Sequence, residues 1–220
     1  MQTMQWSKRS WMLPVAASLT GFALAGLTSG LWLAAQTQES VTAKTQQSAI
    51  TIKVFKSGLF SGFAHNHVVV APIARAALDT TKLTAEITVV TKEMKVTDPE
   101  VSDKDRSEIQ STMLGPKVLD SEKYAEIHFR SSRIEPAGAQ HYRVAGTLDL
   151  HGVKKEITLE VTGGPEHFHG ATKLKQTDYG IKPISLFGGS VKVKDELELE
   201  FDVYGEAPAT PGKPRASATK

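Results

Sequence analysis

The chain has 220 residues, which is room for one domain of ordinary size with short appendages. Its 26 Lys and Arg and 24 Asp and Glu residues give a net charge of +2. Five of the cations and one acid lie in residues 1–35 and 206–220, so residues 36–205 hold 21 cations against 23 acids. A nucleic-acid-binding protein needs a concentrated basic surface, and this central part lacks the charge for one. The chain has no cysteine, which excludes disulfides, thiolate metal sites and a Cys nucleophile.

The N-terminus carries a long uncharged apolar run, residues 11–35, directly after Lys8 and Arg9. As a helix it would reach about 37 Å, more than the roughly 30 Å of a bilayer core. A basic flank before an apolar run is also typical of a signal peptide, although cleavage after Ala35 would place Leu33 where a small residue is preferred. We therefore predict that residues 1–35 are a signal anchor or a signal peptide, and that this segment makes the membrane a partner. In either case the basic flank stays in the cytoplasm and the rest of the chain is exported. The predicted location is periplasmic or extracytoplasmic, either free or anchored in the inner membrane.

Composition divides the remaining chain into three parts. Residues 36–47 are polar and are predicted to be a linker. Residues 206–220 are rich in Pro, Ala, Ser and Lys and are predicted to be a disordered tail. The predicted domain is residues 48–205.

Within this domain, apolar and polar residues alternate with a period of two, which is typical of strands with one wet and one buried face. The clearest strand is at 196–205, where Leu197, Leu199 and Phe201 alternate with acidic residues. A tight turn at His151-Gly152 predicts a hairpin between the strands on either side of it. The other predicted strands are 48–56, 67–78, 82–91, 126–133, 141–150 and 170–177.

One segment departs from this alternation. Residues 102–114 are predicted to be a helix, with Ser102 as its N-cap and Gly115 at its end. The sequence therefore predicts a mainly β protein with about eight antiparallel strands and one inserted helix, arranged as a barrel or a sandwich. The interior of an eight-stranded barrel is filled by side chains or holds one small ligand.

Four stretches resemble the YceI-like (polyisoprenoid-binding) family. They are SAITIKVFKSGLFSGFAHNH, MLGPKVLDSEKYAEIHFRSSRI, YRVAGTLDLHGVKKEITLEV and TDYGIKP with the closing strand, and they occur in the family's order over residues 48–204. The resemblance implies a lipocalin-like antiparallel barrel around an apolar cavity. It also implies that this cavity holds an isoprenoid chain, such as a quinone tail or a polyprenyl lipid. The family has no shared catalytic apparatus, so we expect a binding protein and not an enzyme. We expect no cofactor other than a bound isoprenoid lipid, and the expected partner is an apolar lipid or an isoprenoid quinone.

Two groups of apolar residues are candidates for ligand binding. One is a loop of large apolar groups among glycines, which would form a lid, a membrane-dipping entrance or a plug that folds back into the barrel. The other is the inward-facing set of the strands, whose members either contact a ligand or simply fill the interior. The candidates are Leu59, Phe60 and Phe63 in the loop, and Phe129, Leu148, Leu150, Leu159, Val161, Leu199 and Phe201 on the strands.

Histidines suggest a second hypothesis. His65 and His67, and again His167 and His169, stand at i and i+2, a spacing that presents both imidazoles on one face of a strand to a metal such as zinc or copper. Each pair alone is an incomplete site. The sequence has no G-x-S-x-G, phosphate-loop or H-E-x-x-H motif, so we expect no catalytic residues. Two alternatives to a lipid-binding protein therefore remain: a periplasmic metal-binding module, and a filled barrel that presents its acidic strand faces to a protein partner.

Overall fold

The computed structural model describes residues 40–42, 47–58, 66–79 and 82–205. The predicted membrane segment, the predicted tail and the loop with Leu59, Phe60, Phe63 and His65 lie outside these residues. In the part of the chain that is described, no helix is both long enough and apolar enough to cross a membrane.

The described residues are mostly strand. The strands are β1 (Ser40–Thr42), β2 (Ala49–Ser57), β3 (His67–Asp79), β4 (Thr84–Val90), β5 (Lys95–Val96), β6 (Glu126–Gly138), β7 (His141–Leu150), β8 (Val153–Gly164), β9 (His167–Lys175), β10 (Ser185–Leu186) and β11 (Val191–Tyr204). The α-helix is α1 (Asp103–Leu114), and there are 3-10 turns at η2 (Thr91–Glu93), η3 (Gln176–Tyr179) and η4 (Phe187–Gly189).

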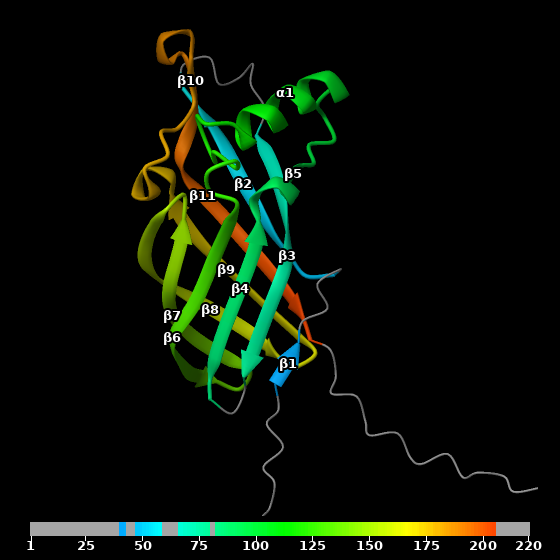
Figure 1. Ribbon diagram of the computed structural model, residues 1–220, viewed down its shortest axis with the longest axis vertical. Coiled ribbons are helices and arrows are strands. Elements are labelled where there is room, and N and C mark those ends of the chain that lie inside the picture. The colour runs from blue at the N-terminus through cyan, green and yellow to red at the C-terminus, as the bar shows by residue number, and fades with distance from the viewer. Residues whose placement is uncertain (1–39, 43–46, 59–65, 80–81, 206–220) are drawn as a thin grey trace, which may run out of the picture. The chain divides into compact units, whose positions relative to one another are not determined.

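Eight of these strands close into a barrel (Figure 1). The order of neighbours is β3-β2-β11-β9-β8-β7-β6-β4, and β4 pairs with β3 to complete the circle. Every pairing is antiparallel. The prediction of an antiparallel barrel of about eight strands with one helix is confirmed. Short strands add to its edges: β5 pairs with β3, β10 with β11, and β1, which lies inside the segment predicted to be a linker, with the end of β3.

Local sequence explains the tightest connection. His151 and Gly152 both have positive φ, 53° and 76°, between the paired residues Leu150 and Val153. This backbone conformation suits a two-residue hairpin because its twist matches that of the flanking strands. The predicted hairpin is confirmed.

The helix α1 lies at one end of the barrel (Figure 1). The Ser102 side chain accepts a hydrogen bond from the Asp105 backbone N–H at 3.1 Å, as its predicted N-cap role requires. The side chain of Gln110 ties the helix to β5, because its Nε2 donates to the Met94 carbonyl and its Oε1 accepts from the Val96 N–H, both at 2.7 Å. No residue of α1 is fully buried, so the helix lies at the barrel end without entering its core.

An apolar cavity at the helix-bearing end of the barrel

The barrel interior has two apolar clusters. The cluster away from α1, here called the lower cluster, is closely packed. Its rings fit because glycines lie opposite them: a Cβ atom at Gly146 would be 2.6 Å from Cζ of Phe129, and one at Gly170 would be 2.3 Å from Cζ of Phe201. The buried members of the lower cluster are Ile73, Ala76, Phe129, Val144, Leu148, Leu159, Val161, Leu174, Tyr179, Phe201 and Val203.

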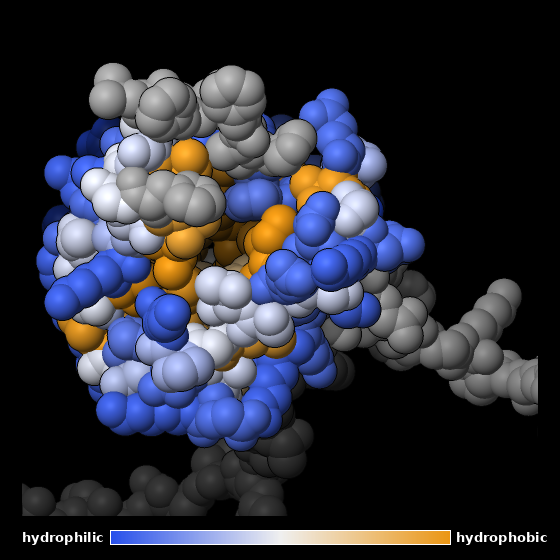
Figure 2. All heavy atoms as spheres, turned by 90° about the horizontal axis from the view of Figure 1, so that it is seen from above, coloured by the Kyte–Doolittle hydropathy of each residue, from blue (hydrophilic) through white to orange (hydrophobic). Residues whose placement is uncertain are grey.

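The cluster below α1, here called the upper cluster, surrounds empty space. Its buried members are Val69, Ala71, Val89, Met94, Val96, Leu119 and Ile181. Because most of these side chains are short, they cannot meet across the width of an eight-stranded barrel. The result is a cavity of about 490 Å³. Figure 2, which looks at the α1 end, shows apolar residues around this hollow.

The cavity wall comes from many strands and from the helix. The strand β2 contributes Ile50, Ile52 and Val54, and α1 contributes Ile109 and Met113. Leu148, Leu174 and Tyr179 belong both to the lower cluster and to the cavity wall, so they form the floor of the cavity. A hollow of this size with a mostly apolar wall falls within the range of small-molecule sites.

One polar residue of the wall, His67, is held by a buried carboxylate behind it. Nδ1 of His67 is 2.6 Å from Oδ2 of Asp98, and Oδ1 of Asp98 accepts the Val68 backbone N–H at 2.6 Å. The Asp98 side chain is buried, while His67 is partly exposed and lines the cavity. Arg106 donates two hydrogen bonds to the Asp98 carbonyl, which fixes this loop against α1. The cavity wall therefore has an imidazole held in place by a buried carboxylate, within a mostly apolar lining.

The structure divides the strand residues that were predicted to bind a ligand. Leu148, Leu150 and Leu199 line the cavity. The other four, Phe129, Leu159, Val161 and Phe201, lie in the lower cluster and not in the cavity wall. Ligand contact remains a prediction for all seven, and the cavity favours the first three.

Sequence reasoning did not select several wall residues. The alternation in β2 could have selected Ile50, Ile52 and Val54. No local signal identifies Met94, Leu119 or Ile181, because these residues come from turns and loops that reach the cavity only after the barrel closes.

The second histidine pair contacts one carboxylate on the barrel wall. Nε2 of His167 is 2.8 Å, and Nδ1 of His169 is 3.1 Å, from Oδ1 of Asp202. Partial burial acts to raise the pKa of Asp202, but the hydrogen bonds with His167 and His169 outweigh it and lower this pKa. Within the described ranges, no group of three or more His, Cys, Asp or Glu side chains is placed to hold a metal ion.

The acidic strand faces are not bare. Outward carboxylates pair with cations on neighbouring strands: Lys53 with Glu200 at 2.7 Å, Arg143 with Glu160 at 3.0 Å and Lys173 with Glu196 at 2.9 Å. These pairs reduce the local negative charge on which the hypothesis of an acidic interaction surface depended.

An eight-stranded antiparallel barrel with an apolar cavity at one end has the architecture of a lipocalin-like binding protein. The family model of the YceI-like domain matches residues 33–204, and the chain belongs to the YceI-like family. The predicted membership is confirmed.

Relatives and solved structures agree with this assignment. The chain is 30% identical to a UPF0312 protein of Vibrio parahaemolyticus over 115 residues, which are 48% of this chain and 59% of the relative. It is 32% identical to a UPF0312 protein of Pseudomonas putida over 97 residues, which are 40% of this chain and 47% of the relative. The match thus spans about half the length of these relatives. The crystal structure of BcnA from Burkholderia cenocepacia shares the fold with a TM-score of 0.57 and 19% identity, over 73% of this chain and 98% of that one.

Proposed function

We propose that this protein binds an apolar lipid, of isoprenoid type, noncovalently in the cavity of the upper cluster. The observation that carries the proposal is the hollow of about 490 Å³ with a predominantly Val, Ile, Leu and Met wall. Membership of a family known as polyisoprenoid-binding barrels supports the same choice. The role is one of binding and shielding, with no covalent chemistry, and export through residues 1–35 would place it outside the cytoplasm.

The volume limits how much of a ligand is enclosed. At about 30 Å³ for each non-hydrogen atom, the cavity holds roughly sixteen atoms, which is about three isoprene units. A longer chain would therefore extend out of the barrel. We propose that the polar end of the ligand lies near the cavity residues His67, Lys56 and Lys192.

The expected affinity follows from that size. Burying a methylene is worth about 0.8 kcal/mol, but association and ordering consume much of the gain. At a net 0.3 to 0.5 kcal/mol per atom, roughly sixteen atoms give about 5 to 8 kcal/mol. This corresponds to a Kd between about 200 µM and about 1 µM.

The test is calorimetric titration of the full chain with farnesol, an alcohol with three isoprene units. Ala71 is buried in β3 and lines the cavity, so Ala71→Phe places a ring inside it. We expect the wild type to bind one farnesol per chain and Ala71→Phe to bind at least tenfold more weakly.

A matched control puts the same ring on the outside. Ala171 in β9 is exposed, so Ala171→Phe adds an equal apolar surface without changing the cavity. We expect it to bind farnesol as the wild type does. Failure of the wild type to bind, or equal loss in both variants, would reject the cavity as the site.

A further inference from the structure

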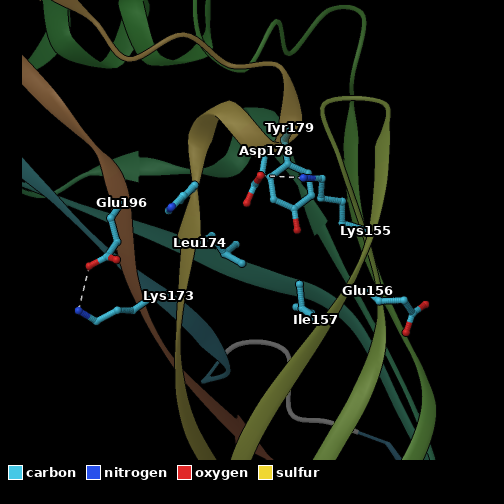
Figure 3. Close-up of a pocket in the computed structure, with 9 residues that line it drawn as sticks. Lys155, Glu156, Ile157, Lys173, Leu174, Asp178, Tyr179 and Glu196 are labelled. Carbon is cyan, nitrogen blue, oxygen red and sulfur yellow. Dashed lines mark hydrogen bonds and ion pairs between the residues drawn. The ribbon is translucent and has the colours of Figure 1, made fainter.

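The barrel wall is incomplete at the seam between β8 and β9. These strands pair from Gly164 and His167 up to Glu160 and Ala171, and the pairing ends there. Residues 153–159 of β8 continue to pair with β7, and residues 172–175 of β9 continue to pair with β11. The two strands therefore separate toward the α1 end, as Figure 3 shows.

The turn η3 folds across this gap and places Tyr179 in it. The Lys155 ammonium donates to the Asp178 carboxylate at 2.7 Å, which links β8 to the turn. The Tyr179 side chain is the largest of the fully buried side chains, with 1% of the residue exposed. Its ring therefore closes the opening that the sheet hydrogen bonds leave.

The hydroxyl of Tyr179 has no hydrogen-bond partner among the described residues, although nearly all of the side chain is buried. Figure 3 shows it pointing into the gap between Leu174 on one strand and Ile157 on the other. Burial, with a smaller effect from Asp178, raises the pKa of Tyr179, so the hydroxyl stays protonated and can donate. Among the described residues no buried side-chain oxygen or nitrogen lacks a partner, so this hydroxyl reaches the surface of the gap, where its O–H can donate to a ligand oxygen in place of water.

A depression of about 300 Å³ opens on this hydroxyl, here called the seam pocket. Its apolar members are Ile157 and Leu174, and its charged members are Lys155, Lys173, Lys175, Glu156, Asp178 and Glu196. Three cations face three acids. Lys155 already pairs with Asp178, and Lys173 with Glu196 at 2.9 Å. This balance gives no advantage to an anion or a cation, so a neutral group fits best.

The turn that carries Tyr179 is held by hydrogen bonds to β11. Thr177 donates its backbone N–H and its hydroxyl to the Asp195 carboxylate, at 2.9 and 2.6 Å. Nε2 of Gln176 donates to the Lys194 carbonyl at 2.8 Å. A donor held in place by its neighbours loses little freedom when it binds an acceptor, as a recognition site requires.

We propose that the seam pocket binds a neutral carbonyl or hydroxyl compound of about ten non-hydrogen atoms, with Tyr179 Oη donating a hydrogen bond to its oxygen. The site is separate from the lipid cavity in its polarity, although Leu174, Lys175 and Tyr179 line both. The proposal does not depend on lipid binding.

The experiment uses two probes of similar shape, acetophenone and ethylbenzene, of which only the first has an oxygen. Each is titrated into the methyl-labelled full chain, as wild type and as Tyr179→Phe. The methyl signal of Ile157 reports on the seam pocket, and those of Ile52 and Leu199 report on the lipid cavity. We expect acetophenone to shift the seam-pocket signal saturably, with an affinity five- to tenfold lower in Tyr179→Phe. The affinity for ethylbenzene should differ less than twofold between the two proteins.

The proposal is overturned if acetophenone binds both proteins equally, or if only the Ile52 and Leu199 signals move. A second measurement needs the wild type alone. The carbonyl stretching band of bound acetophenone should move to lower frequency than in an aprotic solvent, as expected for an accepted hydrogen bond. An unshifted band would also contradict the proposal.

Discussion

The two ends of the barrel are built from the same strands and the same alternating pattern, yet one is solid and the other is hollow. In the lower cluster, the rings of Phe129 and Phe201 occupy the space that neighbouring glycines leave free, so the interior is filled. In the upper cluster the wall residues are short, with Val69, Ala71 and Val89 buried but unable to reach across. The difference shows that side-chain size at facing positions decides whether a barrel of this width has a cavity, and that alternation alone does not.

The largest expected effect is on the solid end. Phe201→Ala removes a buried ring from the packed cluster and should lower the free energy of unfolding by about 3 to 5 kcal/mol. Leu199→Ala, two residues along β11 at the cavity wall, should cost less than half as much because empty space already adjoins that side chain. Urea denaturation measures both. Equal losses would mean that the two ends do not differ in packing.

Ligand binding should also distinguish the two clusters. At a farnesol concentration of about 100 times Kd, the wild type should gain about 2.7 kcal/mol of stability. Leu159→Ala in the lower cluster should lower the starting stability but keep this gain, whereas Ala71→Phe should lose it. Thermal melting with and without farnesol tests this. If the gain in stability disappears in Leu159→Ala, the ligand binds in the lower cluster and not in the proposed cavity.

The glycines under the rings should be intolerant of side chains. A Cβ atom at Gly170 would meet Cζ of Phe201 at 2.3 Å and the Glu160 carbonyl oxygen at 2.6 Å, so Gly170→Ala should cost about 1 to 3 kcal/mol. At Gly164 no atom lies within 4 Å of such a Cβ, so Gly164→Ala is the matched control and should change stability by less than about 0.5 kcal/mol. Equal melting temperatures for the two variants would contradict the close packing.

The smallest expected effect concerns the turn at the floor of the cavity. The Thr177 hydroxyl and backbone N–H lower the pKa of Asp195 below its usual value of 3.8. A lowered pKa means that the charged form stabilises the fold above the unfolded pKa, and that this stability is lost as the pH falls through the folded pKa. Asp195→Asn should therefore lower the free energy of unfolding at pH 7 by at most about 1 kcal/mol, and this difference from the wild type should shrink below about pH 4. Urea denaturation at several pH values measures it. A difference that is independent of pH would exclude the carboxylate charge as its cause.

Much of the fold could be predicted from sequence because it depends on local signals. Alternation locates the strands, the His151-Gly152 pair fixes a hairpin, and Ser102 caps the helix. The short strand β1 could not be foreseen, because its three residues are ordered by pairing with β3 and not by their own pattern.

The site was only partly predictable. Alternation shows that Leu148, Leu199 and Phe201 point inward. It does not show how far along the barrel axis each one lies, or which side chains face it. Phe201 lies in the packed half, and Leu199 at the cavity, because of what lies on the opposite strands. The seam pocket depends on where the β8–β9 pairing ends and on the return of η3, neither of which has a local sequence signal.

The most direct measurement is lipid mass spectrometry of the full chain purified gently from the cells that express it, with Ala71→Phe and Ala171→Phe prepared in parallel. We expect about one apolar molecule per chain in the wild type and in Ala171→Phe, and a strong depletion in Ala71→Phe. An identical lipid content in all three proteins, or none in the wild type, would contradict the claim that the helix-bearing end of the barrel is a lipid site.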